Sequence, residues 1–166
     1  MALPKLNTPT YELEIPSTDE KIKYRPFLVK EEKILMMAME AGKSSDITGA
    51  VKEIVHECTF GKLDISKLPM FDVEFLFLNI RAKSVGEVSK LKILCPDDKE
   101  TYADIEVDLT KVQVQVGEDH TNKIVLNDDA GMIMTYPTID SFKETGITDI
   151  TPANMLDVIT TCILQI

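Results

Sequence analysis

The residues with the clearest catalytic potential lie two positions apart in the segment Ile54-Val-His-Glu-Cys58, where an imidazole and a thiol could form a nucleophilic pair. Such a pair works only when both side chains converge in one cleft. The apolar spacing around them predicts a helix, in which residues two positions apart point about 200° away from each other. We therefore predict a structural Cys58 at the edge of a core beside a solvated His56, and no cysteine hydrolase.

Adjacent carboxylates could supply general acid–base chemistry at Asp97-Asp98 and at Asp128-Asp129. Catalytic carboxylates require a cleft that raises their pKa values by burial. Both pairs fall among turn-forming residues, and so does His120, so we expect solvated side chains at these places. The sequence has no twelve-residue calcium-loop spacing, no phosphate-binding glycine loop and no dinucleotide fingerprint. We predict no catalytic residue, no cofactor and no enzyme activity.

Cys95 is the cysteine whose surroundings most resemble a metal site. The segment Ile93-Leu-Cys-Pro96, followed by a turn and a strand, has the shape of one half of a zinc ribbon. A zinc knuckle needs a second ligand two to four residues later, and those positions hold Asp97, Asp98 and Lys99. We therefore predict a buried or edge thiol at Cys95 and no metal site.

The charge of the chain is acidic and unevenly distributed. The formal net charge is −10, and residues 97–129 alone hold ten acids and three bases. This balance argues against binding to a phosphate backbone, which needs clustered Lys and Arg, but it permits a basic protein partner. The acids either keep the chain soluble or imitate DNA and block a host nucleic-acid-binding protein. Because they occupy alternate strand positions and turns, and no long acidic array, we favour the first interpretation.

Cysteine usage and hydropathy bear on the compartment. Three cysteines, and an N-terminus without the charged start and apolar run of a secretory signal, indicate reduced thiols in a cytosol. The apolar stretches fall short of the ~20 residues of a membrane span. We expect a soluble protein that is intracellular at synthesis, with one compact domain or one domain carrying a small insert.

The elements that must position these side chains begin with a β-hairpin. Residues 11–15 alternate apolar and acidic side chains, residues 21–25 alternate basic and apolar ones, and turn-forming residues lie between them. Antiparallel pairing places the apolar side chains on one face. On the other face, Glu12 and Glu14 are expected opposite the basic residues of the second strand, including Arg25.

Three helices are predicted after the hairpin. Apolar residues recur at helical spacing in residues 29–41, in a segment that Ser45 or Asp46 can cap and Gly61 ends, and in residues 70–84. The third helix is apolar on most of its faces and is expected in a core or an interface.

The first of these helices is rich in methionine. Met36, Met37 and Met39 cannot all lie on one narrow apolar stripe. Methionine side chains adapt to irregular surfaces. The helix is therefore expected either to present a broad face to the core or to pack on a partner protein as well.

Residues 88–137 are predicted to form a β-rich insert. Five short alternating segments, among them residues 111–116, could form one small sheet with a wet, acidic face that resembles a degenerate zinc ribbon. Helices are predicted over residues 139–144 and from Thr151 to Ile166. The apolar C-terminal segment suggests either a firmly docked helix or a fragment of a longer chain, and we favour the fragment.

The predicted fold class is α+β, with three parts. Residues 1–87 hold the hairpin and three helices, residues 88–137 form the insert, and the helices in residues 138–166 pack back on the first part.

Two segments of this sequence resemble the baseplate hub subunit family of T4-like bacteriophages. The first is Pro16-Ser-Thr leading to Lys23-Tyr-Arg-Pro-Phe-Leu-Val-Lys-Glu-Glu-Lys-Ile-Leu-Met-Met-Ala38, and the second is Ile80-Arg-Ala-Lys-Ser-Val-Gly-Glu87. More loosely, Leu94-Cys-Pro-Asp97 resembles an insert that some members carry with paired cysteines, from which this chain departs. The resemblance covers residues 9–166 in outline.

The resemblance implies a non-enzymatic hub component or hub assembly factor that acts through protein–protein contacts. It implies other baseplate hub proteins as partners in an oligomer or hetero-complex, assembly in the host cell cytoplasm, and a place in the tail baseplate of the virion. An ion pair between Arg81 and Glu31 is expected to tie the third helix to the first. The residues expected to carry the family signature or the contacts are Arg25, Pro26, Phe27, Glu31, Met36, Met39, Arg81, Lys83, Ser84 and Gly86.

Overall fold

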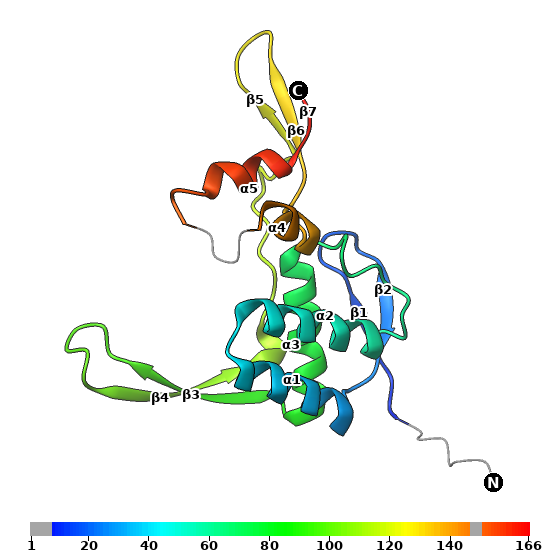
Figure 1. Ribbon diagram of the computed structural model, residues 1–166, viewed down its shortest axis with the longest axis vertical. Helices are drawn as coiled ribbons and strands as arrows, with labels where there is room; N and C mark the ends of the chain where they lie inside the picture. Colours follow the sequence, from blue (N-terminus) through cyan, green and yellow to red (C-terminus); the bar gives the residue numbers. More distant parts are fainter. Residues whose placement is uncertain (1–7, 147–150) are drawn as a thin grey trace.

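The computed structural model describes residues 8–146 and 151–166, and its fold is of the predicted α+β class. A central body contains the N-terminal hairpin and three helices (Figure 1). Two slender projections leave this body in different directions. One is the hairpin of residues 88–108, and the other contains residues 123–134 and the C-terminal segment.

The N-terminal hairpin consists of two antiparallel strands, β1 (Tyr11–Glu14) and β2 (Lys21–Tyr24). The register is the one that the charge pattern predicts: Leu13 lies opposite Ile22 on the face that enters the core, and Glu12 lies opposite Lys23 on the exposed face. The Lys23 Nζ lies 3.5 Å from the Glu12 Oε1. The alternation of side chains therefore fixes both the pairing and the buried face.

Three helices complete the body: α1 (Val29–Ala41), α2 (Ser44–Cys58) and α3 (Met70–Val85). Gly42 ends α1 in the left-handed conformation, with φ of 68°. Helix α2 packs against both other helices. The core joins apolar residues of the hairpin, α2, α3 and the connecting segments: Ile15, Ile22, Tyr24, Ile54, Val55, Cys58, Ile65, Val73, Leu76, Ile80 and Ile139.

The first projection is a hairpin of two seven-residue antiparallel strands, β3 (Val88–Leu94) and β4 (Tyr102–Asp108). Its base is attached to the body because Leu109, which begins a short 3₁₀ helix, is buried and this turn packs on α3. The Leu109 N–H also donates to the Glu87 carbonyl at 2.8 Å. The rest of the hairpin extends away from the helices (Figure 1).

The second projection contains a three-stranded antiparallel sheet and two short helices: β5 (Lys123–Val125), β6 (Gly131–Met134), α4 (Ile139–Thr145), α5 (Met155–Thr161) and β7 (Ile163–Gln165). Ile139 at the start of α4 enters the core of the body, and the Met70 N–H donates to the Pro137 carbonyl at 3.1 Å. These contacts attach the second projection to the start of α3.

The predicted single five-stranded sheet is wrong. Residues 112–116 form no strand, and the remaining strands divide into the pair β3–β4 and the sheet β5–β6–β7. The burial of Leu109 on α3 separates the two sheets, because it returns the chain to the body directly after β4.

The predicted helix from Thr151 to Ile166 is also wrong at its C-terminal end. Helix α5 ends at Thr161, and Ile163 then pairs with Met134 on the open edge of β6. The C-terminal strand thus belongs to a sheet that begins in the predicted insert. The division of the chain into three parts remains a prediction.

Candidate functional site: a buried polar cluster and exposed contact surfaces

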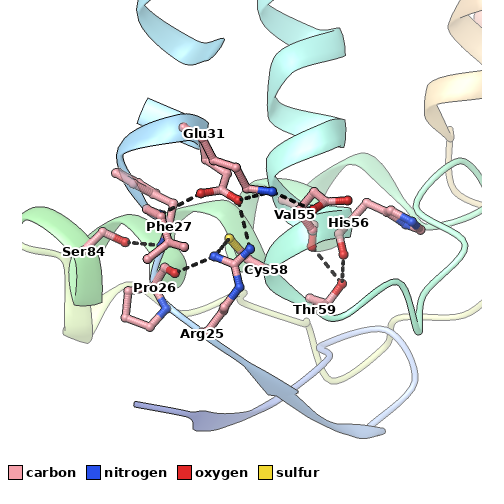
Figure 2. Close-up of polar contacts among 12 residues, drawn as sticks. Arg25, Pro26, Phe27, Glu31, Val55, His56, Cys58, Thr59 and Ser84 are labelled. Atoms are coloured by element: carbon pink, nitrogen blue, oxygen red, sulfur yellow. Dashed lines mark hydrogen bonds and ion pairs between the residues drawn. The ribbon is translucent and has the colours of Figure 1, made fainter. Parts of the chain in front are cut away.

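Half of the ten signature residues gather where β2 leads into α1, beside the ends of α2 and α3 (Figure 2). They are Arg25, Pro26, Phe27, Glu31 and Ser84. The other five lie elsewhere on α1 and α3 or just beyond α3.

An ion pair between Arg25 and Glu31 forms the centre of this cluster. The guanidinium Nη2 lies 2.9 Å from the Glu31 Oε1, and its Nη1 donates to the Pro26 carbonyl at 3.0 Å. The other carboxylate oxygen of Glu31 accepts the Leu28 N–H at 2.7 Å, so the same side chain caps the first turn of α1. Both partners are buried, and Glu31 has no exposed surface.

The surroundings keep this pair ionised. Burial alone would raise the pKa of Glu31, but the hydrogen bonds from Arg25 and from the Leu28 N–H outweigh it and hold the pKa below its ordinary value. Burial would lower the pKa of Arg25, and the bond to Glu31 raises it above its ordinary value. Removing one partner of a buried pair leaves an uncompensated charge and typically costs about 3–5 kcal/mol. The pair therefore fixes the junction between β2 and α1.

Ser84 connects the same junction to α3. Its hydroxyl accepts the Phe27 N–H at 3.0 Å and donates to the Ile80 carbonyl, one turn earlier in the helix, at 2.6 Å. A backbone N–H outside the regular elements is thereby satisfied by a side chain of a different element. The two signature segments, 57 residues apart at this contact, meet through it.

Two expectations about arginines are wrong. Glu31 pairs with Arg25, and the expected partner Arg81 lies half-buried on α3. Arg25 also leaves the exposed face of the hairpin, because its N–H donates to the Cys58 carbonyl at 3.0 Å and this bond turns the chain inward after Tyr24. Side chains alternate between the two faces of a hairpin only as far as the strand continues, and β2 ends at Tyr24.

The remaining signature residues are dispersed. The side chains of Met36 and Met39 are 60% and 62% exposed on α1. Lys83 forms an ion pair with Glu87 and lies over the ring of Tyr11, with Nζ 5.4 Å from the ring centroid. Gly86 follows α3 with φ of 139°, which an L side chain rarely adopts, and leads the chain into β3. Lys83 and Gly86 therefore lie next to the base of the first projection.

The body contains a buried carboxylate that the sequence did not reveal. Asp72 has no exposed surface and accepts two hydrogen bonds from Ser17, one from the N–H at 3.2 Å and a short one from the hydroxyl. Burial raises the pKa of Asp72, although the Ser17 bonds oppose this. The pair ties the turn between β1 and β2 to the first turn of α3. A lone Asp in an apolar helix was the available signal, but its partner lies 55 residues away.

The side chains of Cys58 and His56 lie in different surroundings: Cys58 is fully buried in the core and His56 is exposed. Burial raises the pKa of the Cys58 thiol to about 11, which keeps it protonated at neutral pH. Figure 2 shows the His56 ring directed away from the Cys58 sulfur. Among residues 8–146 and 151–166, no group of three His, Cys, Asp or Glu side chains is placed to hold a metal ion.

Several acids of the segment 97–129 stabilise local turns. The Asp98 carboxylate accepts the N–H groups of Glu100 and Thr101, both at 3.0 Å, and these bonds together with the Thr101 hydroxyl lower the pKa of Asp98 to about 2. The Asp108 carboxylate accepts the N–H and the hydroxyl of Thr110. These acids have local partners and do not form a continuous array.

The β3–β4 hairpin exposes apolar side chains on one face. Leu91 and Ile105 lie opposite each other, with Ile93 beside them, and their exposed fractions are 45%, 39% and 47%. The opposite face carries the cross-strand pairs Lys90–Glu106 and Lys92–Asp104. A contiguous apolar face rimmed by polar residues is typical of a protein-contact surface.

Comparisons with known proteins identify one family. Within the described residues, no helix has the length and apolar character needed to cross a membrane. Searches of curated proteins and of solved structures find no match. The model of one protein family, described as T4 bacteriophage base plate protein, matches residues 8–166. Since this match spans the body and both projections, the chain belongs to the T4 bacteriophage base plate protein family.

Proposed function

We propose that this protein is a non-enzymatic component or assembly factor of the baseplate hub and acts through protein–protein contacts. Membership of the base plate family supports a structural or assembly role in the phage baseplate. The observation that carries the finer proposal is the exposed apolar face of the β3–β4 hairpin, which is held away from the body. An isolated two-stranded hairpin is at best marginally stable in water, so a partner that covers this face would stabilise it.

A second surface supports the same proposal. Helix α1 exposes Met36, Met37 and Met39 together with Val29, whose side chain is 80% exposed. Methionine-rich surfaces adapt to a partner because their side chains are flexible and polarizable. In this proposal, the buried Arg25–Glu31 pair and the Ser84 contact have a structural role: they fix the orientation of α1 and of the hairpin base relative to the body.

Co-expression with the hub proteins of the same phage tests the proposal. The full chain, carrying an affinity tag, is expressed with each hub protein, and capture is measured by mass spectrometry. Capture of at least one hub protein is expected. Capture of none of the hub proteins would contradict the hub assignment.

Two matched variants locate the contact. Leu91→Ser with Ile105→Ser removes apolar surface from the hairpin, and Met36→Gln with Met39→Gln does the same on α1; all four side chains are exposed, so the body should keep its stability. Reduced capture by the hairpin variant is expected. Unchanged capture by both variants would contradict these surfaces as the contact sites.

A further inference from the structure

The two long edges of the β3–β4 hairpin carry opposite charges. On the polar face, β3 presents Lys90 and Lys92, whereas β4 presents Asp104, Glu106 and Asp108. Among residues 8–146 and 151–166, no strand pairs with either edge of the distal hairpin, which extends away from the body (Figure 1). A free edge with unpaired backbone groups is a template for pairing with another strand.

The register determines which backbone groups point outward. At the tip, the Cys95 N–H donates to the Thr101 carbonyl at 2.8 Å, and at the base, the Leu109 N–H donates to the Glu87 carbonyl. Hydrogen-bonded and non-hydrogen-bonded pairs alternate along an antiparallel ladder, so the odd-numbered residues of both strands bond across the hairpin. The N–H and C=O groups of Lys90, Lys92 and the acidic residues opposite them therefore point away from it.

The residues that offer backbone hydrogen bonds at each edge are thus also the charged ones. This coincidence restricts the strands that can be added. A second β3 against β3 places lysines beside lysines, and β4 against β4 places acids beside acids, which is destabilising for directly opposed like charges. Only β3 against β4 brings opposite charges together.

We infer that the hairpin is a self-association element, in which the β3 edge of one copy pairs antiparallel with the β4 edge of a second copy. The pairing repeats the register already present inside one hairpin, with Lys90 opposite Glu106, Lys92 opposite Asp104 and Leu91 opposite Ile105. The inference rests on the proposed function in that it names a second copy as one partner of the hairpin surface.

The resulting sheet has two distinct faces. The charged side chains lie in complementary rows on one face, between Val88 at the base and Leu94 and Tyr102 near the tip. Leu91, Ile93 and Ile105 of both copies become neighbours on the other face. The contact is heterologous because it joins two different edges. A pair of copies therefore leaves one β4 edge and one β3 edge unpaired, and every edge is paired only when several copies form a ring. The neighbouring apolar rows reduce the exposure of Leu91, Ile93 and Ile105.

Sedimentation of the purified full chain tests self-association without any hub protein. We expect the average mass to rise above 18.6 kDa as the concentration increases, and added salt to weaken the association because the edges are exposed. A mass that stays at the monomer value up to the solubility limit would overturn the inference. Capture of hub proteins by such a monomer would leave the proposed function intact.

A charge-swapped hairpin distinguishes edge pairing from packing of the apolar faces. The variant Lys90→Glu, Lys92→Glu, Asp104→Lys, Glu106→Lys keeps opposite charges across each hairpin, so its fold and its association with itself should persist. Against the unmodified chain, every β3-to-β4 contact becomes repulsive, whereas β3 against β3 and β4 against β4 become attractive. Cross-links between β3 of a labelled unmodified chain and β4 of the variant should therefore form at least about tenfold less than between two unmodified chains. Equal cross-linking of β3 to β4 in the two mixtures would overturn edge pairing.

A proline variant tests the backbone hydrogen bonds. Lys92→Pro removes an outward N–H that the hairpin itself does not use, whereas Leu91→Pro removes an inward one and serves as the control for loss of the hairpin. Lys92→Pro should retain the circular dichroism of the unmodified chain and lose self-association. Retention of both would contradict the inference.

Discussion

The central body and the β3–β4 hairpin use similar residues in opposite ways. In the body, Leu76 and Ile80 are buried, and the charged pair Arg25–Glu31 is enclosed with them. In the hairpin, Leu91 and Ile105 remain in contact with solvent, and the ion pair Lys90–Glu106 is exposed. The core of the body satisfies its apolar and polar groups within the chain, whereas the hairpin leaves one apolar face exposed to solvent.

The difference between the two regions follows from how each is attached to the rest of the chain. The body has a hairpin, three helices and the start of α4 around one core. The hairpin is attached to the body at its base, where the turn that begins at Leu109 packs on α3 and the Leu109 N–H donates to the Glu87 carbonyl. The body should therefore determine the stability of the chain, and the hairpin its associations. Four sets of variants can break or sharpen this division.

The largest effect is expected from Arg25→Met. It removes the buried cation beside Glu31 and leaves the exposed Lys30, whose Nζ lies 3.3 Å from the Glu31 Oε1, as the remaining charged partner. The free energy of unfolding measured in urea should fall by up to about 3–5 kcal/mol. The control Lys23→Met removes a pair with Glu12 in which both side chains are mostly exposed, and it should cost less than about 1 kcal/mol. Similar losses in the two variants would contradict the structural role of the buried pair.

Leucine truncation compares the two regions directly. Leu76→Ala creates a cavity in the core and should destabilise the chain by about 2–5 kcal/mol. Leu91→Ala on the hairpin should change the unfolding free energy by less than about 0.5 kcal/mol, because its side chain is already exposed. Urea denaturation of both variants measures the two losses of unfolding free energy. A large loss for Leu91→Ala would mean that other parts of the isolated chain cover the apolar face of the hairpin.

Ser84→Ala removes the link between the two signature segments. It leaves the Phe27 N–H without its acceptor and should cost about 1–3 kcal/mol by thermal or urea denaturation. Ser45→Ala, on the exposed surface of α2, is the control and should have almost no effect. Equal effects would show that the Phe27–Ser84 bond does not order the junction.

The smallest effect concerns pH and Asp72. Burial raises its pKa in the folded chain, so the folded state binds the proton more tightly than the unfolded state does. Its contribution therefore favours folding at low pH and is lost as the pH rises through the raised pKa. Asp72→Asn should gain stability relative to the unmodified chain as the pH rises from about 4, the ordinary pKa of the group, towards neutrality. A constant difference across this range would contradict the burial of a titrating carboxylate.

Local patterns predicted most of the elements. Alternation predicted the register of β1 and β2, and helical spacing predicted α1, α2, α3 and the first turns of α4. Turn chemistry at residues 96–99 predicted the tip of the β3–β4 hairpin. These features depend on residues that are close in the sequence.

Long-range contacts account for the features that the sequence did not predict. The pairing of β7 with β6 and the bond between Asp72 and Ser17 join residues about 30 to 55 positions apart, and no local pattern encodes them. The signature residues were named from a family resemblance, which could not identify Arg25 as the partner of Glu31 because that contact depends on where β2 ends. Their expected role in contacts remains a proposal.

Hydrogen exchange of the hairpin tests the central claim most directly. Amide exchange is measured by mass spectrometry for the purified chain at low concentration and for the same chain in its assembly with hub proteins. We predict fast exchange in residues 88–108 of the isolated chain, strong protection of these residues in the assembly, and equal protection of the core helices α2 and α3 in both. Equally fast exchange of the hairpin in both samples would contradict the account.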